Sequence, residues 1–193
     1  MEKKSTRIRK EEIILAALAV VGKKGMRDLT IAAIANSAGM SEANIYRHFS
    51  GKEEIFSALA DFIGSSVMDK AATIAADSRK PLDKLETIFF SHMSVITAHP
   101  GIPSFTFSED MLLGDTALSQ SLKIRIGAYL ETIAGIIAAG IQEGELKKDL
   151  SPRETALIFL GIIQFAAVRC TALNTDITVE SQKLWTNFMK MIC

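Results

Sequence analysis

Residues 30–49 read TIAAIANSAGMSEANIYRHF, and their pattern determines the predicted structure of the N-terminal part of the chain. Thr30 and Ser41 are predicted helix caps, and Gly39 tolerates the positive φ that a turn requires. The stretch therefore predicts a short helix, a turn and a second short helix that ends at His48. Apolar contacts between them are expected from Ile31, Ile34, Ala38, Met40, Ile45 and Phe49. Such a pair is a helix-turn-helix, whose second helix enters the major groove of DNA.

Polar side chains on and around the second helix suit contact with DNA. Asn44 can pair bidentately with adenine, and Arg47 can read guanine or hold a phosphate. Tyr46 and His48 can donate hydrogen bonds to phosphate oxygens. Lys52 stands where the following helix starts, so its charge adds to exposed backbone amides that favour phosphate. These residues predict a DNA-binding surface.

The charge distribution favours a polyanionic partner, with one exception. Residues 1–52 hold ten Lys and Arg against five Asp and Glu, whereas residues 53–193 hold twelve against seventeen. A basic head is typical of nucleic-acid binding, and an ordinary solvated surface is the alternative. Glu42 is the exception, because an acid near the groove repels phosphate. It either reads a cytosine amine or begins the second helix, and the second role is preferred.

Helical periodicity continues through the remainder of the chain. Further helices are predicted over 9–24, from 52 onward, over 81–98, 117–143 and 152–172, and from a cap at 178 to 192. Residues 101–114 are expected to form a loop with a short helix. With about nine helices and no convincing strand, the fold class is all-α. A three-helix domain is expected over 1–51 and a larger helical domain over 52–193.

Composition and spacing exclude several classes of protein. Cys170 and Cys193 are the only cysteines, which excludes a disulfide scaffold and a tetrathiolate zinc site. The most apolar stretch, 156–168, is too short to span a membrane, so no membrane partner is expected. A charged N-terminus without a signal-peptide core predicts a cytoplasmic protein. No phosphate loop or nucleophile elbow occurs, so neither an enzyme nor a cofactor is expected.

Two histidines are the candidate metal ligands of the sequence. His92 and His99 are seven residues apart, and Glu109 and Asp110 follow them. Histidines at this spacing lie about 10 Å apart on a helix, and no paired-ligand spacing accompanies them. No metal site is therefore expected. His92 is expected either to line a pocket or to be a hydrogen-bonded core residue.

A resemblance to the TetR family of transcriptional regulators is carried by the spacing pattern of 26 consecutive residues, 30–55. They read Thr30-x3-Ile34-Ala35-x2-Ala38-Gly39-x-Ser41-x3-Ile45-Tyr46-x-His48-Phe49-x2-Lys52-Glu53-x-Ile55. Met40 departs from the family pattern by replacing the usual valine, a conservative change in a packing position. The resemblance covers roughly the first 60 residues, and the rest of the chain agrees only in length and helix count.

The resemblance implies a homodimer in which the first three helices bind a double-stranded DNA operator. It also implies a larger helical domain with a small-molecule pocket and, through its last two helices, the dimer interface. Backbone contacts are implied for Tyr46, His48 and Lys52, and a phosphate contact for Thr30; packing within the small domain is the alternative for Tyr46. The complete expected DNA-binding set is Thr30, Ser41, Glu42, Ala43, Asn44, Tyr46, Arg47, His48 and Lys52.

Aromatic and thioether side chains gather in the sequence around the break at Pro100-Gly101, which predicts an apolar pocket. Its polar anchors would be His92 and Tyr129, and a solid core is the alternative. The expected lining residues are Phe89, His92, Met93, Phe105, Phe107, Met111, Tyr129 and Ile133.

The two C-terminal helices carry apolar residues at helical spacing, so each subunit can bury a common face against a second copy. The expected interface residues are Ile158, Ile162, Phe165, Arg169, Trp185 and Phe188. For Trp185 and Phe188, packing within the subunit is the alternative.

Three functions are compatible with these features. The preferred one is a DNA-binding repressor released from its operator by a small, mostly apolar ligand of unknown identity. The alternative is a protein of the same fold that is controlled by a protein partner or by DNA layout, without a small ligand. The third, an all-helical enzyme, has no catalytic spacing to support it. Repression and activation are not distinguished by these residues.

Overall fold

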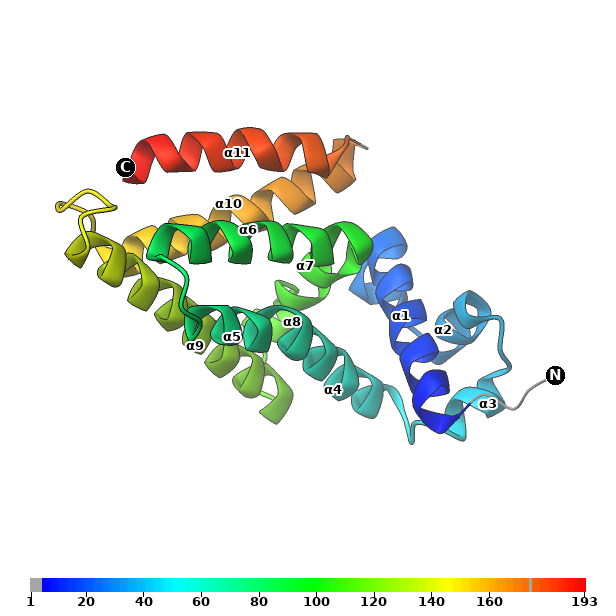
Figure 1. Cartoon of the computed structure of the whole chain (residues 1–193). Helices are drawn as coiled ribbons and strands as arrows, with labels where there is room; N and C mark the ends of the chain where they lie inside the picture. Colours follow the sequence, from blue (N-terminus) through cyan, green and yellow to red (C-terminus); the bar gives the residue numbers. More distant parts are fainter. Residues whose placement is uncertain (1–4, 174) are drawn as a thin grey trace. The chain divides into compact units, whose positions relative to one another are not determined.

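The computed structural model describes residues 5–173 and 175–193 (Figure 1). Within these ranges the chain forms helices and connections and no strand, which confirms the all-α class. The α-helices are α1 (Thr6–Lys24), α2 (Ile31–Ala38), α3 (Glu42–Tyr46), α4 (Lys52–Ile63), α5 (Lys70–Ala75), α6 (Pro81–Ala98), α7 (Gly101–Thr106), α8 (Glu109–Leu112), α9 (Ala117–Gln142), α10 (Pro152–Leu173) and α11 (Ile177–Ile192). A 3-10 helix, η1 (Met26–Asp28), and a π-helix, η2 (Gly64–Asp69), complete the order.

Three predicted elements differ from the observed ones for local reasons. The segment after Gly101 forms two short helices, α7 and α8, where one was expected. Helix α11 is capped by Asp176, whose carboxylate accepts the Thr178 amide at 2.8 Å, so Thr178 is not the cap. Helix α3 ends at Tyr46, because the Arg47 amide turns back to the Asn44 and Ile45 carbonyls.

Packing divides the chain into two compact units. Unit 1 comprises residues up to Ile63 together with His99–Leu122, and unit 2 comprises Gly64–Ala98 together with Lys123–Cys193. The chain therefore passes between the units three times. This division differs from the boundary expected after residue 51, because α4, α7 and α8 pack with the N-terminal helices.

A close backbone contact joins α1 to α7 within unit 1. An added Cβ at Gly101 would overlap the carbonyl oxygen of Leu18, and one at Gly22 would lie 3.0 Å from the Gly101 nitrogen. The next turn of α7 carries Phe105, whose buried ring meets that of Phe56 edge-on at 5.7 Å between centroids. These contacts bind a segment from the middle of the chain to the N-terminal helices.

Aromatic side chains form the centre of unit 2, where α6, α10 and α11 lie side by side (Figure 1). The ring centroid of Phe89 lies 5.3 Å from that of Trp185 and 5.8 Å from that of Phe159. The ring centroids of Phe159 and Phe188 are 5.6 Å apart. Trp185 and Phe188 are buried in this core. Both side chains therefore pack within the subunit, which is the alternative to their place in the dimer interface, and leave little surface for a second copy.

Helix α9 is the one helix among the described residues that is long and apolar enough to cross a membrane. Of the most apolar 18-residue stretch of α9, 33% is buried within the protein. Core helices of globular proteins share this length and composition. We assign no membrane role to α9.

The glycine contact predicts the effect of one methyl group. Gly101→Ala should lower the free energy of unfolding by about 1–3 kcal/mol, because the clash is with backbone that cannot rotate away. Gly127→Ala is the matched control, since nothing lies within 4 Å of its added Cβ on α9. That substitution should raise stability by about 0.5–1 kcal/mol. Urea unfolding of both variants tests this, and equal effects would contradict the assigned contact.

Candidate nucleic-acid interface

Local hydrogen bonds fix the path of the chain from α2 into α3. The Thr30 hydroxyl accepts the Ala33 amide at 3.1 Å, and the Ser41 hydroxyl accepts the Asn44 amide at 3.2 Å. Between them, Gly39 adopts the left-handed conformation with φ 62°. The Met40 amide donates to the Ala35 carbonyl at 2.9 Å and closes the turn. The predicted caps and turn residue are confirmed.

The inner side of this helix pair is buried in unit 1. Ile34 and Ala35 from α2, with Ile45 from α3, are shielded from solvent, as is Phe49 just beyond α3. The Lys10 ammonium of α1 lies 4.7 Å from the centre of the Phe49 ring. Because the apolar residues face inward, the polar residues of α3 are left outside.

The structure brings the nine predicted DNA-binding residues together in unit 1 and leaves most of them exposed. Asn44 and His48 are half-buried, and the seven others are exposed: Thr30, Ser41, Glu42, Ala43, Tyr46, Arg47 and Lys52. Tyr46 exposes 55% of its surface. Its alternative assignment to internal packing is therefore wrong, while DNA contact by these residues remains a prediction.

His48 is oriented by burial. Its Nδ1 atom is buried and has no hydrogen-bond partner among the described residues. A phosphate cannot reach a buried atom, so a phosphate contact from His48 would have to use Nε2.

A carboxylate fixes the start of α4 and was not predicted from the sequence. Glu54 accepts the Ser50 amide at 2.7 Å and the Ser50 hydroxyl at 3.0 Å, and it pairs with Lys10 of α1 at 3.1 Å. The Ser50 amide, followed by Lys10, lowers the pKa of Glu54 from 4.5 to about 2. The available signal was a serine followed by acids at the third and fourth positions, a variant of the capping box. This cap positions Lys52 in the first turn.

The eight predicted pocket residues are divided between the two units. In unit 2, Phe89, His92, Met93, Tyr129 and Ile133 are buried, and His92 Nδ1 lies 3.1 Å from the Tyr129 hydroxyl. Burial lowers the pKa of His92 to about 4 and raises the pKa of Tyr129. The two anchors thus form an uncharged, mutually hydrogen-bonded pair.

The three predicted pocket residues in unit 1 do not share one environment. Phe105 and Met111 are buried, whereas Phe107 is exposed.

The ring of His99, the other candidate metal ligand, meets the Phe62 ring edge-on with 5.3 Å between the centroids, and burial lowers the pKa of His99. Across the described residues, no three His, Cys, Asp or Glu side chains gather as metal ligands.

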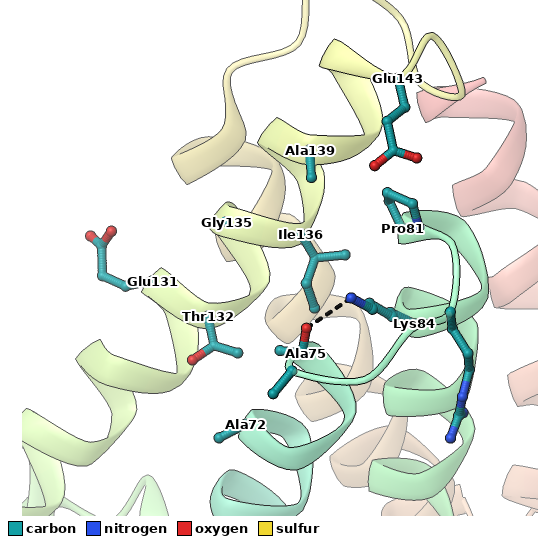
Figure 2. A pocket seen from close by; sticks show the side chains of 12 residues that line it. Ala72, Ala75, Pro81, Lys84, Glu131, Thr132, Gly135, Ile136, Ala139 and Glu143 are labelled. Atoms are coloured by element: carbon teal, nitrogen blue, oxygen red, sulfur yellow. Dashed lines mark hydrogen bonds between the residues drawn. The ribbon is translucent and has the colours of Figure 1, made fainter.

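An open groove of about 480 Å³ lies in unit 2 between α5 and α9 (Figure 2). Small side chains form its floor, including Ala72, Ala75 and Ala139, and Glu131 and Glu143 stand at its edge in Figure 2. None of the eight predicted pocket residues lines this groove. One of them, Met111, lines a second cavity of about 530 Å³ in unit 1.

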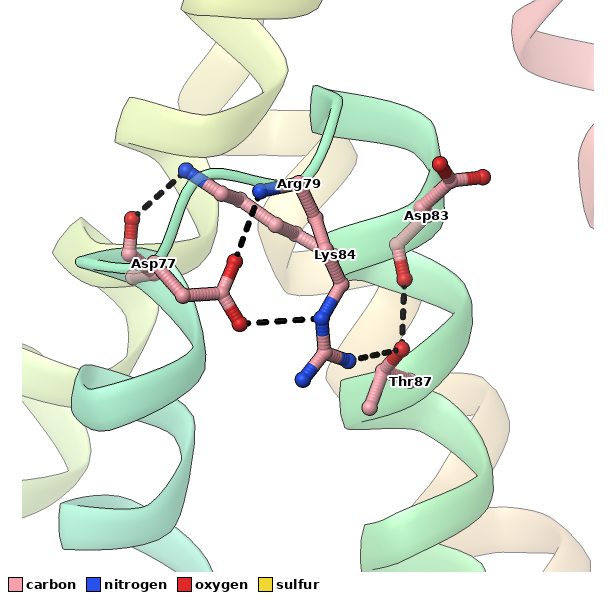
Figure 3. A network of polar contacts seen from close by, with 6 residues as sticks. Asp77, Arg79, Asp83, Lys84 and Thr87 are labelled. Carbon is pink, nitrogen blue, oxygen red and sulfur yellow. Dashed lines mark hydrogen bonds and ion pairs between the residues drawn. The ribbon is translucent and has the colours of Figure 1, made fainter.

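Polar contacts hold the edge of the unit 2 groove, where α5 turns into α6 (Figure 3). The Lys84 ammonium donates to the Ala75 carbonyl at 2.8 Å, at the end of α5 where a cation complements the helix dipole. Arg79 pairs with Asp77 at 2.9 Å and donates to the Thr87 hydroxyl at 2.7 Å. Asp77, Arg79 and Lys84 are therefore engaged in contacts within the protein at this turn.

Helix α10 presents an apolar outer face. Phe165 exposes 70% of its surface, Ile158 is exposed, and Ile162 is half-buried. Arg169 is also exposed and pairs with Glu180 of α11 at 3.1 Å. Three further exposed apolar residues on this helix, which the sequence interpretation omitted, are Leu157, Val168 and Leu173.

Comparisons with known proteins identify relatives of both parts of the chain. Residues 13–59 match the profile of bacterial regulatory proteins of the tetR family, and residues 59–174 match the C-terminal region of YsiA-like proteins. The nucleoid occlusion factor SlmA of Marinobacter nauticus is 29% identical over 150 residues, covering 77% of this chain and 74% of that protein.

Two solved structures illustrate the shared fold. The ketosteroid transcriptional regulator KstR2 of Mycobacterium tuberculosis has a TM-score of 0.83 and 20% identity, covering 99% of this chain and 96% of that one. The regulator FadR of Bacillus subtilis, solved with stearoyl-CoA, has a TM-score of 0.72 and 23% identity, covering 93% and 97%.

Residues of α3 and its C-terminal flank, together with Lys52 in the first turn of α4, predict two kinds of DNA-binding defect. Tyr46→Ala or Lys52→Ala should weaken binding to all sequences and reduce its salt dependence, because phosphate contacts are lost. Asn44→Ala or Arg47→Ala should instead change sequence preference, by about 1–3 kcal/mol for a bidentate base contact. Fluorescence anisotropy over a salt series measures both effects. Lys23→Ala, at the end of α1, is the charge-matched control, and an equal loss in that variant would contradict the assignment.

The Glu54 cap predicts a dependence of stability on pH. A carboxylate whose pKa is depressed by folding stabilises the protein above its unfolded pKa, and this contribution is lost as pH falls. Glu54→Gln should therefore be less stable than the parent at pH 7, with the difference shrinking between pH 4.5 and 2. Thermal unfolding over this range measures it, with Glu11→Gln on the exposed side of α1 as control. A difference that is constant with pH would refute the cap.

Proposed function

The chain belongs to the TetR family of bacterial regulatory proteins, and on that premise we propose that it is a homodimeric repressor released from its operator by a small, mostly apolar ligand. As a family member it is a DNA-binding regulator and not an enzyme. Beyond family membership, repression, the homodimer, the apolar effector and a cytoplasmic location are parts of this proposal.

The exposed second helix of the helix-turn-helix is the observation that carries the proposal. Tyr46 and Arg47 are exposed, while Ile34, Ala35 and Ile45 of the same helix pair are buried on its inner side. An exposed tyrosine and arginine beside a lysine at a helix start suit a phosphate backbone. Bound across a promoter, such a protein would block transcription.

The outer face of α10 supports the dimer. Phe165, Val168 and Leu157 are exposed on one helix, and an isolated subunit would leave them in water. Each large apolar side chain gains about 1.5–3 kcal/mol on full burial. A two-fold copy that covers this face would also set the spacing between the two recognition helices, and hence between operator half-sites.

The buried pair of unit 2 supports an apolar ligand. His92 and Tyr129 are the polar side chains among the buried residues predicted there, and with a pKa of about 4 the imidazole is neutral at physiological pH. A neutral pair can exchange its mutual hydrogen bond for one to a ligand without burying a charge. The related FadR structure contains stearoyl-CoA, a molecule with a long apolar chain.

Control by a protein partner is the second candidate function. It is compatible with the similarity to SlmA, whose name, nucleoid occlusion factor, specifies no small-molecule effector. The close packing of Phe89 against Phe159 and Trp185 favours it, because a filled core has no room for a ligand.

Selection of bound sequences from random DNA tests the proposal directly. It should yield a palindromic operator, which is then used in retardation assays with stearoyl-CoA and stearic acid as probes. An apolar effector should weaken operator binding by roughly 5- to 150-fold. Enrichment of no sequence would refute sequence-specific regulation, and an operator unaffected by either probe would favour a protein partner.

The dimer predicts the effect of a single charge. Phe165→Glu should convert the protein to monomers, because a carboxylate cannot be buried against its copy without a partner. Sedimentation velocity measures the change. Leu113→Glu is the matched control, since it places the same charge at a residue of unit 1 that is 77% exposed. A parent chain that sediments as a monomer would overturn the proposed dimer.

A further inference from the structure

A cavity of about 530 Å³ in unit 1 combines apolar walls with two acids. Its walls come from the first turns of α4, from α8 and from the connection into α9. Phe56, Met111 and Leu118 supply apolar surface, and Glu53 and Asp110 supply the carboxylates. No basic side chain is among the residues that line it.

The wall formed by the α8–α9 connection is rigidly built. The buried Ser119 hydroxyl lies 2.7 Å from the carbonyl oxygens of both Met111 and Gly114. The Thr116 hydroxyl accepts the Ser119 amide at 3.1 Å and caps α9. An added Cβ at Gly114 would overlap the Asp110 carbonyl oxygen, so the chain can turn this closely only with glycine. This wall of the cavity is therefore held in place by its own hydrogen bonds.

The opposite wall carries an aromatic ring, Phe56, that already attracts a cation of the chain itself. The Lys52 ammonium lies 5.1 Å from the centre of the Phe56 ring, within the range of cation–π attraction. Phe56 is also fixed edge-on by Phe105. A held ring and two carboxylates favour positive charge in this space, whereas an anion would meet Glu53 and Asp110.

We propose that this cavity binds an amphipathic organic cation, with its apolar groups against Phe56, Met111 and Leu118 and its positive charge toward Glu53 and Asp110. An inorganic cation would leave the apolar walls in water, and a neutral apolar molecule would remove water from the carboxylates without replacing it. Only a ligand with both apolar groups and a positive charge can contact the apolar side chains and also pair with the carboxylates.

Binding in this cavity would act on DNA through Lys52. A cation beside Phe56 competes with the Lys52 ammonium for the ring and repels it. Lys52 is also the predicted phosphate contact in the first turn of α4, so its displacement would weaken operator binding. This second step rests on the proposed function, whereas cation binding itself does not.

Tetraphenylphosphonium and tetraphenylborate test the binding step, because they have nearly the same shape and opposite charge. Titration calorimetry with the full chain and no DNA should show the phosphonium bound at least about tenfold more tightly than the borate. Equal binding of the two ions, or no binding of the phosphonium, would overturn the proposal without any variant.

Variants then locate the site. The double variant Glu53→Gln, Asp110→Asn should bind the phosphonium at least about tenfold more weakly, because both carboxylates are removed. Glu109→Gln, which removes the neighbouring exposed acid on α8 that does not line the cavity, should bind it as the parent does. Thermal unfolding establishes that each variant folds. Unchanged affinity in a folded double variant would overturn the assignment.

Operator retardation tests the second step separately. The phosphonium should weaken DNA binding by the parent chain and leave the double variant unaffected. Binding without an effect on DNA would refute the route through Lys52 and keep the site. A chain that binds the phosphonium but no DNA sequence would instead refute the proposed function.

Discussion

The contact between α1 and α7 holds unit 1 together. Gly22 and Gly101 allow two backbones to approach more closely than any side chain would permit. This approach places Phe105 against Phe56, and Phe56 is a wall of the cavity beside Lys52. The position of the first turn of α4, and with it one predicted DNA contact, depends on two glycines almost eighty residues apart in the sequence.

Much of the helix-turn-helix could be predicted because its determinants are local. Thr30 and Ser41 cap amides three residues ahead, and Gly39 relieves strain at its own position, so short spacing contains the whole interaction. Lys52 and Tyr46, the predicted phosphate contacts, lie close to these local determinants, and both are exposed. The Glu54 cap was missed because two adjacent acids follow Ser50, and only the fold selects between them.

The rest could not be predicted because the relevant partners are distant in sequence. Trp185 has the spacing of an interface residue, yet Phe89 of α6 covers it inside the subunit. The aromatic residues around Pro100 looked like one cluster, but Phe105 packs in unit 1 and Phe89 in unit 2. Periodicity gives the face of a helix on which a side chain lies, and it does not give what covers that face.

The discontinuity of unit 1 sets a condition for exchanging DNA-binding heads between relatives. The N-terminal family match ends at residue 59, which suggests a natural place to join a foreign head to this body. Such a join would leave the new α1 facing an α7 selected for a different partner, at a contact with no room for a Cβ. The transferable cassette is therefore two pieces of chain, and residues 99–122 must travel with the head for the hybrid to inherit a new operator.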